Sequence, residues 1–228
     1  MRKKTIVAII PARIGSKGIV RKNIKKINNK PLIQWTIDSA KEIKLIDEII
    51  VSTDDENIAK ISRKNGAKVP FLRPKKYAKD GSLGIDPVLH ALKKIRKFDY
   101  VLLLQPTSPM RSQKDIKGII EFTLKNKLKS SVSVNEVKDH PELMYTLNDS
   151  KKIKKEFTQY SSVKLRQKYK KIYRVNGALY FCETKWLLKN NDFLTKDTYG
   201  YIMPLERSID IDNYYDWKIA EMLLKNKN

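Results

Sequence analysis

The 228-residue sequence predicts an α/β fold built on a mostly parallel, open sheet. Two observations support this prediction. Short, continuous apolar runs alternate along the chain with segments whose apolar residues recur at helical spacing. Such alternation is typical of parallel sheets, because parallel strands need crossover connections. A hydrophobic fraction of 41% at this length is sufficient for one large domain that carries a smaller lobe.

The first part of the chain predicts two strands, each followed by a helix. Residues Thr5–Ile10 are apolar and rich in β-branched side chains, and the run ends at Pro11, so we predict a buried parallel strand. An amphipathic helix begins at Pro31, because the first helical turn tolerates proline. We expect the next strand over Glu48–Ser52 and the next helix over Asp55–Lys64.

The alternation continues in the middle of the chain and returns at its end. We predict helices over Pro87–Arg96 and Asp115–Lys125, and strands over Tyr100–Leu104 and Ser131–Val137. A final helix is expected over Tyr214–Lys225. The side chains expected to pack it against the core are Trp217, Ala220, Met222 and Leu223 or Leu224.

The pattern changes between about His140 and Arg174, where short, polar, Lys-rich segments replace the regular alternation. The segments Leu143–Leu147 and Lys152–Phe157 resemble the strands of a hairpin more than elements of a core. We interpret this stretch as an inserted arm, of a kind that extends across a subunit interface. The chain is expected to return to the core at Gly177–Phe181.

The chain is strongly basic, with 48 Lys and Arg against 25 Asp and Glu and a net charge of +23. The basic residues are spread over the whole length, and the densest run, Lys151–Lys155, contains no aromatic side chain for base stacking. We therefore expect no nucleic-acid partner. No run approaches the roughly 20 apolar residues that cross a membrane, so no membrane partner is expected. The single cysteine, Cys182, excludes an intramolecular disulfide and fits a buried position in a cytoplasmic protein.

Loops that follow the predicted strands are the first candidates for function, because ligands of open α/β sheets bind beyond the carboxyl ends of strands. The first such loop contains Arg13, Gly15, Lys17 and Gly18 and continues to Lys22. Its glycines let backbone N–H groups approach a polyphosphate, and its cationic side chains balance the phosphate charge. The spacing matches neither a P-loop nor a dinucleotide motif, and a tight polar turn with solvated charges is the alternative.

The second loop, Gln105–Pro109, follows the apolar strand Tyr100–Leu104. Its amide and hydroxyl groups offer donors and acceptors for a sugar or a carboxylate. A proline-stiffened turn explains the same residues equally well.

The third loop contains Asp210 and Asp212. Carboxylates at positions i and i+2 of an extended segment point to the same side, and this arrangement suits Mg²⁺ with phosphate oxygens and waters as further ligands. An exposed acidic turn is the alternative, with Asp212 as the cap of the following helix. His90 and His140 are far apart and lack a nucleophile partner, so structural roles are expected for both.

Several short segments of the chain occur in an order that is itself specific. They are Ile9-Ile10-Pro11-Ala12-Arg13 with Gly15-Ser16-Lys17-Gly18, Lys22-Asn23-Ile24, Lys30-Pro31-Leu32-Ile33, Val51-Ser52-Thr53-Asp54, Arg73-Pro74, Leu103-Leu104-Gln105-Pro106-Thr107-Ser108-Pro109, Tyr173-Arg174-Val175-Asn176-Gly177-Ala178 and Ser208-Ile209-Asp210-Ile211-Asp212. Together they closely resemble the acylneuraminate cytidylyltransferases, also called CMP-sialic acid synthetases. The resemblance extends over most of the chain.

This resemblance implies a fold of the nucleotide-diphospho-sugar transferase type with a small dimerisation lobe. It assigns residues 1–139 and 197–228 to a nucleotide-binding α/β domain and residues 140–196 to a lobe for dimerisation and sugar binding. A homodimer is therefore the expected assembly. The implied reaction couples CTP and a nonulosonic, sialic-type acid to give the CMP-sugar and pyrophosphate, with Mg²⁺ as cofactor.

The resemblance also implies roles for individual residues. The nucleotide-binding positions are Arg13, Ser16, Lys22, Asn23 and Ser82. The sugar-acid positions are Gln105, Arg166 and Tyr180, with Gln167 and Phe193 as neighbours. Asp210 and Asp212 match the metal ligands. Catalysis is expected to depend on Arg13, Lys22 and Asp210, which neutralise the phosphates directly or through the metal as the 2-hydroxyl of the sugar acid attacks the α-phosphate in line. Two routes for the hydroxyl proton are open: a metal held by Asp210 lowers the pKa of the hydroxyl, or an aspartate takes the proton.

One departure from the family pattern concerns the sugar. Sialic-acid-specific members often have His-Pro-x-Lys, where this chain has His140-Pro141-Glu142-Leu143. Because this Lys is missing, related acids such as legionaminic and pseudaminic acid are also candidate substrates. Enzymes that activate the 2-keto acid KDO share the phosphate loop but lack the Asn176-Gly177-Ala178 context and the Arg166-Gln167 pair. A metal-dependent glycosyltransferase that uses the two aspartates is a further alternative, distinguished by the absence of CTP consumption.

Overall fold

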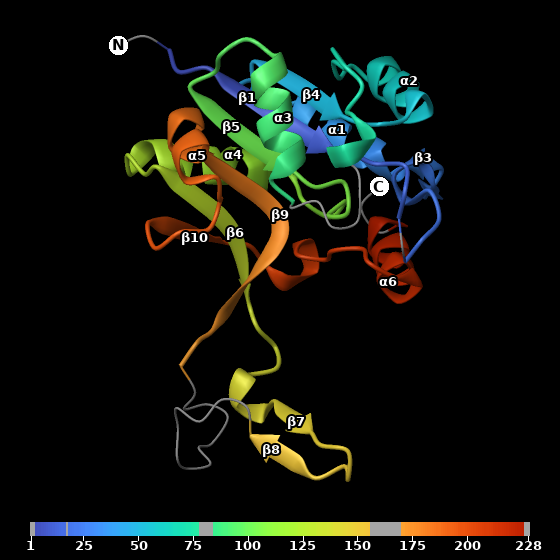
Figure 1. Ribbon diagram of the computed structural model, residues 1–228, viewed down its shortest axis with the longest axis vertical. Coiled ribbons are helices and arrows are strands. Elements are labelled where there is room, and N and C mark those ends of the chain that lie inside the picture. The colour runs from blue at the N-terminus through green and yellow to red at the C-terminus, as the bar shows by residue number, and fades with distance from the viewer. Residues whose placement is uncertain (1–2, 17, 78–83, 156–169, 226–228) are drawn as a thin grey trace.

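The structure is a computed structural model that describes residues 3–16, 18–77, 84–155 and 170–225. Its centre is a six-stranded sheet with the strand order β10-β6-β9-β5-β1-β4 (Figure 1). In chain order the strands are β1 (Ile6–Pro11), β4 (Glu48–Ser52), β5 (Tyr100–Leu104), β6 (Ser130–Glu136), β9 (Tyr173–Glu183) and β10 (Thr198–Ile202). The pairs of β1 with β4, β1 with β5 and β6 with β10 are parallel, whereas β9 runs antiparallel to both of its neighbours. The predicted α/β class with a mostly parallel sheet is confirmed.

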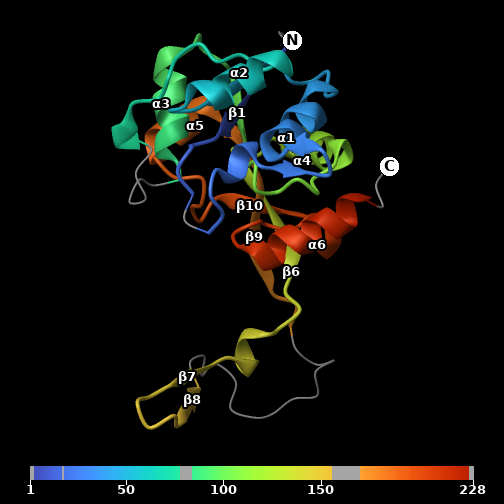
Figure 2. The same ribbon diagram turned by 90° about the vertical axis from the view of Figure 1, so that its right-hand side faces the viewer.

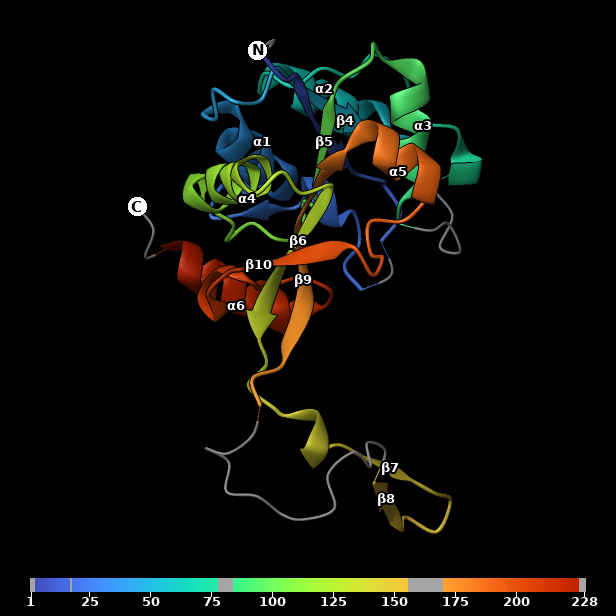
Figure 3. The same ribbon diagram turned by 90° about the vertical axis from the view of Figure 1, so that its left-hand side faces the viewer.

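Helices cover both faces of this sheet (Figures 2 and 3). One face packs against α1 (Leu32–Lys41), α2 (Glu56–Lys64) and α4 (Gln113–Lys125). The opposite face packs against α3 (Asp86–Lys94) and α5 (Thr184–Asn190). Because β1 and β5 are covered on both sides, almost all of their side chains are buried. Burial on two faces explains why these strands are continuous apolar runs rather than alternating ones.

Local capping interactions determine where two of the helices begin. The side chain of Asp55 accepts the N–H of Ile58 at 2.9 Å and so caps α2. At the start of α4, Ser112 and Asp115 form a reciprocal capping box. The helix predicted from Asp115 therefore begins two residues earlier, at Gln113.

The final helix, α6 (Tyr214–Lys225), packs through a separate apolar cluster against the loops that follow β1 and β5, strand β2 (Lys26–Ile27) and the start of α1. Figure 1 shows it beside the main sheet. Trp217, Ala220 and Leu224 of this helix are buried, as predicted. The prediction that Met222 packs against the core is wrong, because Met222 is 59% exposed. Each helical residue turns by about 100°, so Met222 lies roughly opposite Ala220 on the helix surface.

Smaller elements complete the fold. A short antiparallel pair, β2 (Lys26–Ile27) and β3 (Lys30–Pro31), precedes α1. Single 3-10 turns are η1 (Lys22–Ile24), η2 (Lys75–Tyr77), η3 (Pro141–Leu143) and η5 (Leu205–Arg207). Cys182 is buried in β9, as predicted, and burial raises the pKa of its thiol. None of the helices within the described ranges is long and apolar enough to cross a membrane.

An arm projects from the end of the sheet where β6 leaves and β9 enters (Figures 1 to 3). It carries an antiparallel hairpin of β7 (Tyr145–Leu147) and β8 (Ile153–Lys155), which confirms the predicted hairpin. The predicted lobe of residues 140–196 also includes β9 and α5, and the structure places these two elements with the main sheet. The described part of the chain that stands apart from the sheet is therefore 140–155. The dimerisation role of the lobe stays a prediction.

Candidate active site

The candidate site is a cavity of about 480 Å³ beyond the carboxyl end of β5. Residues from three separate parts of the chain form its wall: the loop after β5, strand β9, and the segment that leads into α6 together with the first turns of that helix. They are Gln105, Arg174, Val175, Asn176, Gly177, Tyr180, Ile209, Asp210, Asp212, Asn213, Asp216 and Ile219. The second and third candidate loops of the sequence therefore meet here, as expected for the carboxyl edge of an open α/β sheet.

Asp210 is the most perturbed acid of this cavity. Burial raises the pKa of its carboxyl group, a hydrogen bond with Thr107 lowers it, and the negative charge of Asp212 raises it again. The net pKa lies above the ordinary value of an aspartate. Its Oδ1 atom is buried and has no hydrogen-bond partner among the described residues. A buried carboxylate oxygen without a donor is suited to a cation or to a proton supplied by a ligand.

The first candidate loop reaches the same site through Lys22. Its Nζ donates a hydrogen bond to the carbonyl oxygen of Ile211 at 2.5 Å and lies 3.5 Å from Asp212 Oδ1. Gly18 lies so close to this segment that an added Cβ would be 2.0 Å from the carbonyl oxygen of Asp212. Only glycine permits this approach. The cationic loop after β1 and the two aspartates are thus joined by direct contacts.

Gly177 lies between the acidic and amide groups of the cavity. Its φ of +76° favours glycine, and a Cβ there would lie 3.2 Å from Asp210 Oδ2 and 3.3 Å from Gln105 Oε1. Tyr180 stands on the same strand, and burial followed by the charge of Asp210 raises the pKa of its hydroxyl. The strand thus presents no side chain where Gln105 and Asp210 approach each other.

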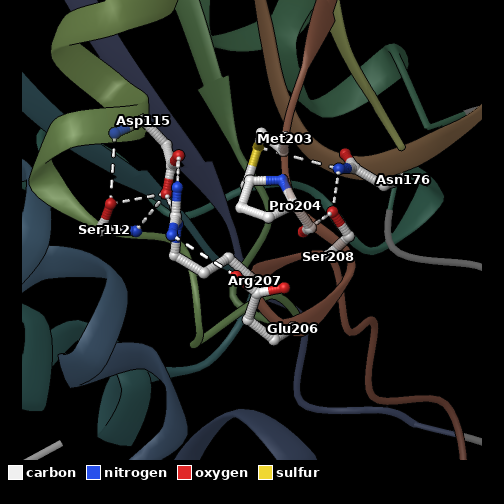
Figure 4. A network of polar contacts seen from close by, with 8 residues as sticks. All are labelled: Ser112, Asp115, Asn176, Met203, Pro204, Glu206, Arg207 and Ser208. Atoms are coloured by element: carbon white, nitrogen blue, oxygen red, sulfur yellow. Dashed lines mark hydrogen bonds and ion pairs between the residues drawn. The ribbon is translucent and has the colours of Figure 1, made fainter. Parts of the chain in front are cut away.

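Two polar contacts hold the segment that precedes Asp210 (Figure 4). Arg207 forms a bidentate pair with Asp115 of α4, with nitrogen to oxygen distances of 2.8 and 3.0 Å. Ser208 accepts a hydrogen bond from Asn176 Nδ2 of β9 at 2.8 Å. The segment is therefore attached both to a helix and to the central sheet just before it enters the cavity. Such attachment limits the positions that the two aspartates can take.

The first half of the cationic loop is organised by neighbouring polar residues. Asn23 Nδ2 donates to the carbonyl oxygen of Arg13 at 2.8 Å, and the N–H of Ile14 donates to Asp54 Oδ1 at 3.1 Å. Arg73 is buried and lies 4.0 Å from Asp54, and burial lowers the pKa of Arg73 more than any other influence. The charge of Arg13 lowers this pKa further, which shows that the two guanidinium groups lie within electrostatic reach.

The predicted site residues fall into three groups in the structure. Gln105, Tyr180, Asp210 and Asp212 line the cavity, and Lys22 contacts its wall. Arg13, Ser16 and Asn23 belong to the loop after β1, where Asn23 is buried and Ser16 is partly exposed. Lys17, Ser82, Arg166 and Gln167 lie outside the described residues.

Phe193 occupies a different environment from the other predicted sugar-acid positions. It is buried in the core, and its ring centroid lies 5.3 Å from that of Tyr180. Its aromatic ring thus supports Tyr180, which itself lines the cavity.

Several residues of the cavity wall had no role in the sequence analysis, among them Arg174, Asn176 and Asp216. Arg174 and Asn176 were noted only as parts of a matching segment, and Asp216 was not noted at all. Asp216 Oδ2 accepts the backbone N–H groups of Asp212 and Asn213 at 3.0 and 3.1 Å. A signal for Asp216 was available, because an acid in the first turn of a helix commonly binds the free N–H groups at the helix start.

Comparison with known proteins identifies the family of the chain. A family model described as cytidylyltransferase matches residues 7–209. The chain is 35% identical over 225 residues to the CMP-N,N'-diacetyllegionaminic acid synthase of Legionella pneumophila, and the match covers 96% of each chain. It is 30% identical over 223 residues to the pseudaminic acid cytidylyltransferase of Campylobacter jejuni, again with 96% of each chain covered. It is 33% identical over 229 residues to the N-acylneuraminate cytidylyltransferase of Escherichia coli, where the match covers all of this chain and 54% of the relative.

Solved structures share the fold at lower sequence identity. A CMP:2-keto-3-deoxy-manno-octonic acid synthetase complexed with CTP superposes with a TM-score of 0.76 and 16% identity, covering 98% of this chain and 100% of the other. The family match covers most of the chain, and the relatives align over nearly its whole length. The chain therefore belongs to the cytidylyltransferase family and is a nucleotidyltransferase of the acylneuraminate cytidylyltransferase type.

Proposed function

We propose that this protein couples CTP to a nonulosonic acid, forming the CMP-sugar and pyrophosphate. The observation that carries the proposal is the single cavity in which Asp210 and Asp212 face Gln105 and Tyr180, with Lys22 bonded to the same wall. Anionic and uncharged polar groups that line one cavity suit a metal-bound polyphosphate beside a polyhydroxylated acid.

The loop after β1 is the proposed site of the triphosphate. Lys22 lies with its amine at the aspartate segment, and Arg13 and Arg73 place two further cations near the loop. A Cβ added to Gly15 would meet open space, whereas Gly18 lies directly against the backbone of Asp212. Backbone N–H groups and cationic side chains of this kind stabilise phosphate oxygens as negative charge moves to the leaving group.

Asp210 and Asp212 are the proposed ligands of Mg²⁺. The buried, unpartnered Oδ1 of Asp210 and the largely exposed carboxylate of Asp212 fit a hard cation that keeps phosphate and water ligands. Within the described ranges, no group of three or more His, Cys, Asp or Glu side chains is placed to hold a metal by protein ligands alone. When bound, Mg²⁺ would supply charge neutralisation at the phosphates.

The proposed reaction is an in-line displacement at the α-phosphorus of CTP. A bond forms between the anomeric 2-hydroxyl oxygen of the sugar acid and the α-phosphorus, while the bond to the bridging oxygen of the β-phosphate breaks and pyrophosphate leaves. The hydroxyl proton is released as the new ester forms. Lys22 and Arg13 balance the charge of the leaving group, and Gln105 and Tyr180 orient the sugar acid.

The sugar acid is proposed to be of the nonulosonic class, with N-acetylneuraminic, legionaminic and pseudaminic acid as candidates. Relatives named for each of these acids match this chain with 30 to 35% identity. Leu143 stands where sialic-acid-specific members often have Lys, and it is 52% exposed on the arm. An apolar residue at this position favours an acid with acyl or deoxy groups over one that needs a cation there.

A substrate panel tests the proposal. Purified protein is incubated with CTP, Mg²⁺ and each of the three acids, with KDO as a comparison, and pyrophosphate release is measured. We expect release with at least one nonulosonic acid and a higher kcat/KM for it than for KDO. The absence of pyrophosphate with every acid would contradict the proposed reaction, and a preference for KDO would contradict the proposed substrate class.

A further inference from the structure

The side chain of Arg111 is buried behind the cavity and makes three hydrogen bonds to different parts of the fold. Its Nη1 donates to the carbonyl oxygens of Gln105 at 3.2 Å and Ala178 at 2.7 Å, and its Nη2 donates to Thr36 Oγ1 at 2.9 Å. The residue is only 2% exposed. One guanidinium group therefore connects the loop after β5, strand β9 and helix α1.

The loop that Arg111 holds is itself attached to the proposed metal ligands. The carbonyl oxygen of Thr107 accepts the N–H of Ile211 at 2.8 Å, and the Thr107 side chain forms a hydrogen bond with Asp210. The other carbonyl that Arg111 binds belongs to Ala178, the residue after Gly177. Gln105, Gly177 and Asp210 all line the cavity. Arg111 thus contacts the backbone of Gln105 and the backbone next to Gly177 directly, and it is connected to Asp210 through the loop that contains Thr107. It does not line the cavity itself.

Burial of this cation is energetically unfavourable for the fold. Burial lowers the pKa of Arg111 to about 9, and the charge of Asp115 offsets only part of that effect. Asp115 is already engaged by Arg207, and no acceptor in the described part of the chain reaches Arg111 Nε. Replacing buried charged groups by apolar ones is often neutral or stabilising, so stability alone does not explain a cation here.

We propose that Arg111 is a positioning residue, whose guanidinium group sets the distance between Gln105, on the sugar-acid side of the cavity, and Asp210, on the metal side. This inference rests on the proposed function. The two groups must face one substrate complex, and a displacement of about 1 Å at a reacting centre costs up to roughly 100-fold in rate. A guanidinium group is suited to the task because its planar array of donors binds several acceptors in fixed directions.

The test compares Arg111→Gln, Arg111→Lys and Thr36→Val with wild-type protein. Thr36→Val is nearly isosteric and removes only the third hydrogen bond of Arg111. The control is Thr123→Val, which removes a buried hydroxyl of α4 that bonds to the Ile119 carbonyl oxygen and to Ser131, with no contact to the cavity. Steady-state pyrophosphate release is measured against sugar acid, CTP and Mg²⁺, together with the Tm of each variant.

We expect Arg111→Gln to lower kcat/KM for the sugar acid by on the order of tenfold to 100-fold, with the KM for CTP nearly unchanged. Arg111→Lys should recover part of the loss, and Thr36→Val should shift the same constant by a smaller factor. Thr123→Val should lower the Tm without changing either KM.

Two results would overturn the inference. If Arg111→Lys and Thr36→Val lower the Tm and leave the sugar-acid constants at wild-type values, as the control does, Arg111 has a structural role only. These two variants decide the question even when Arg111→Gln does not fold. If instead wild-type protein releases no pyrophosphate with any acid, the proposed function on which the inference rests is overturned. That result comes from wild-type protein alone, so it is distinguishable from a failure of the inference about Arg111.

Discussion

At the scale of single residues, the cavity contains a few groups whose burial or backbone conformation is energetically unfavourable when considered alone. Asp210 is buried among other acids, and its Oδ1 lacks a hydrogen-bond partner in the described structure. Gly177 adopts a left-handed backbone conformation so that β9 passes close to Asp210 and Gln105. Strained or unsatisfied groups that persist in a stable fold commonly mark functional sites. Each residue therefore allows a prediction for activity and stability that a control variant can test.

Asp210→Asn is expected to lower kcat by about 100-fold or more, because the variant loses a charged ligand of the proposed metal. Its Tm without Mg²⁺ should be unchanged or higher. The raised pKa of Asp210 means that its charged form destabilises the fold above that pKa, and the neutral amide removes this effect. Asp38→Asn, which removes an exposed ion pair with Lys30 at 3.0 Å, serves as the control. A large drop in Tm with activity retained would contradict the prediction.

Gly177→Ala is expected to reduce both stability and activity. The φ of +76° costs a residue with a Cβ about 1–2 kcal/mol, and the added carbon would press on Asp210 and Gln105. Gly66→Ala is a matched control, because Gly66 has a φ of +94° and its Cβ would meet only the flexible end of Lys41. Thermal unfolding should show similar losses for both variants. Pyrophosphate release should fall well below wild type only for Gly177→Ala, and equal activities would argue against the close approach.

At the scale of elements, the start of α4 both caps a helix and anchors the approach to the site. Asp115 completes the capping box with Ser112 and also binds Arg207 (Figure 4). Arg207 lies three residues before Asp210 in the chain. Burial by itself would raise the pKa of Asp115, but the hydrogen bonds from Arg207 and Ser112 outweigh it and the net pKa is lowered. The charged form of Asp115 therefore stabilises the fold.

This stabilisation should depend on pH. A carboxyl group with a lowered pKa contributes stability above its unfolded pKa of about 4, and the contribution is lost as pH falls through the folded-state value. We expect Asp115→Asn to be roughly 2–3 kcal/mol less stable than wild type at pH 7. Denaturant unfolding should show this difference narrowing below about pH 4. A difference that stays constant from pH 7 to pH 3 would mean that the carboxylate charge is not responsible.

At the scale of the whole molecule, the hairpin of the arm stands away from the sheet (Figure 1) and exposes apolar side chains. Leu147 and Ile153, on the two strands of the hairpin, are 66% and 61% exposed. A two-stranded hairpin is marginally stable in water, so these side chains are suited to burial against another surface. These exposed side chains fit the prediction, made from the sequence, that the arm contacts a second copy of the chain in a homodimer.

Introducing charge on the arm tests that proposal. The double variant Leu147→Glu and Ile153→Glu should weaken self-association, because dimerisation would then bury two carboxylates. Sedimentation over a range of concentrations should show a dimer for wild type and a monomer for the variant. Met222→Glu on α6, where Met222 is 59% exposed, controls for added surface charge and should stay dimeric. A wild-type monomer at all concentrations would contradict the proposed homodimer.

The limits of prediction from sequence follow from the size and environment of the elements. Strands β4 and β5 and helix α6 have the predicted bounds, because their apolar patterns are long enough or continuous enough to be read locally. Helix α5 has seven residues and β10 has five, and neither was predicted. Such short segments carry little periodicity, and their structure follows from packing on the sheet.

The sequence by itself determined the fold class, the cationic loop, the aspartate pair and, through ordered segments, the family. These are properties of local composition and spacing, which do not require knowledge of distant contacts. Only the tertiary structure decided that Gly177 lies between Asp210 and Gln105, that Lys22 bonds to the segment between the aspartates, and that Arg111 joins loop, strand and helix. Each of these contacts joins residues far apart in the chain. Their distances depend on how the whole sheet brings its carboxyl-end loops together, which no local pattern encodes.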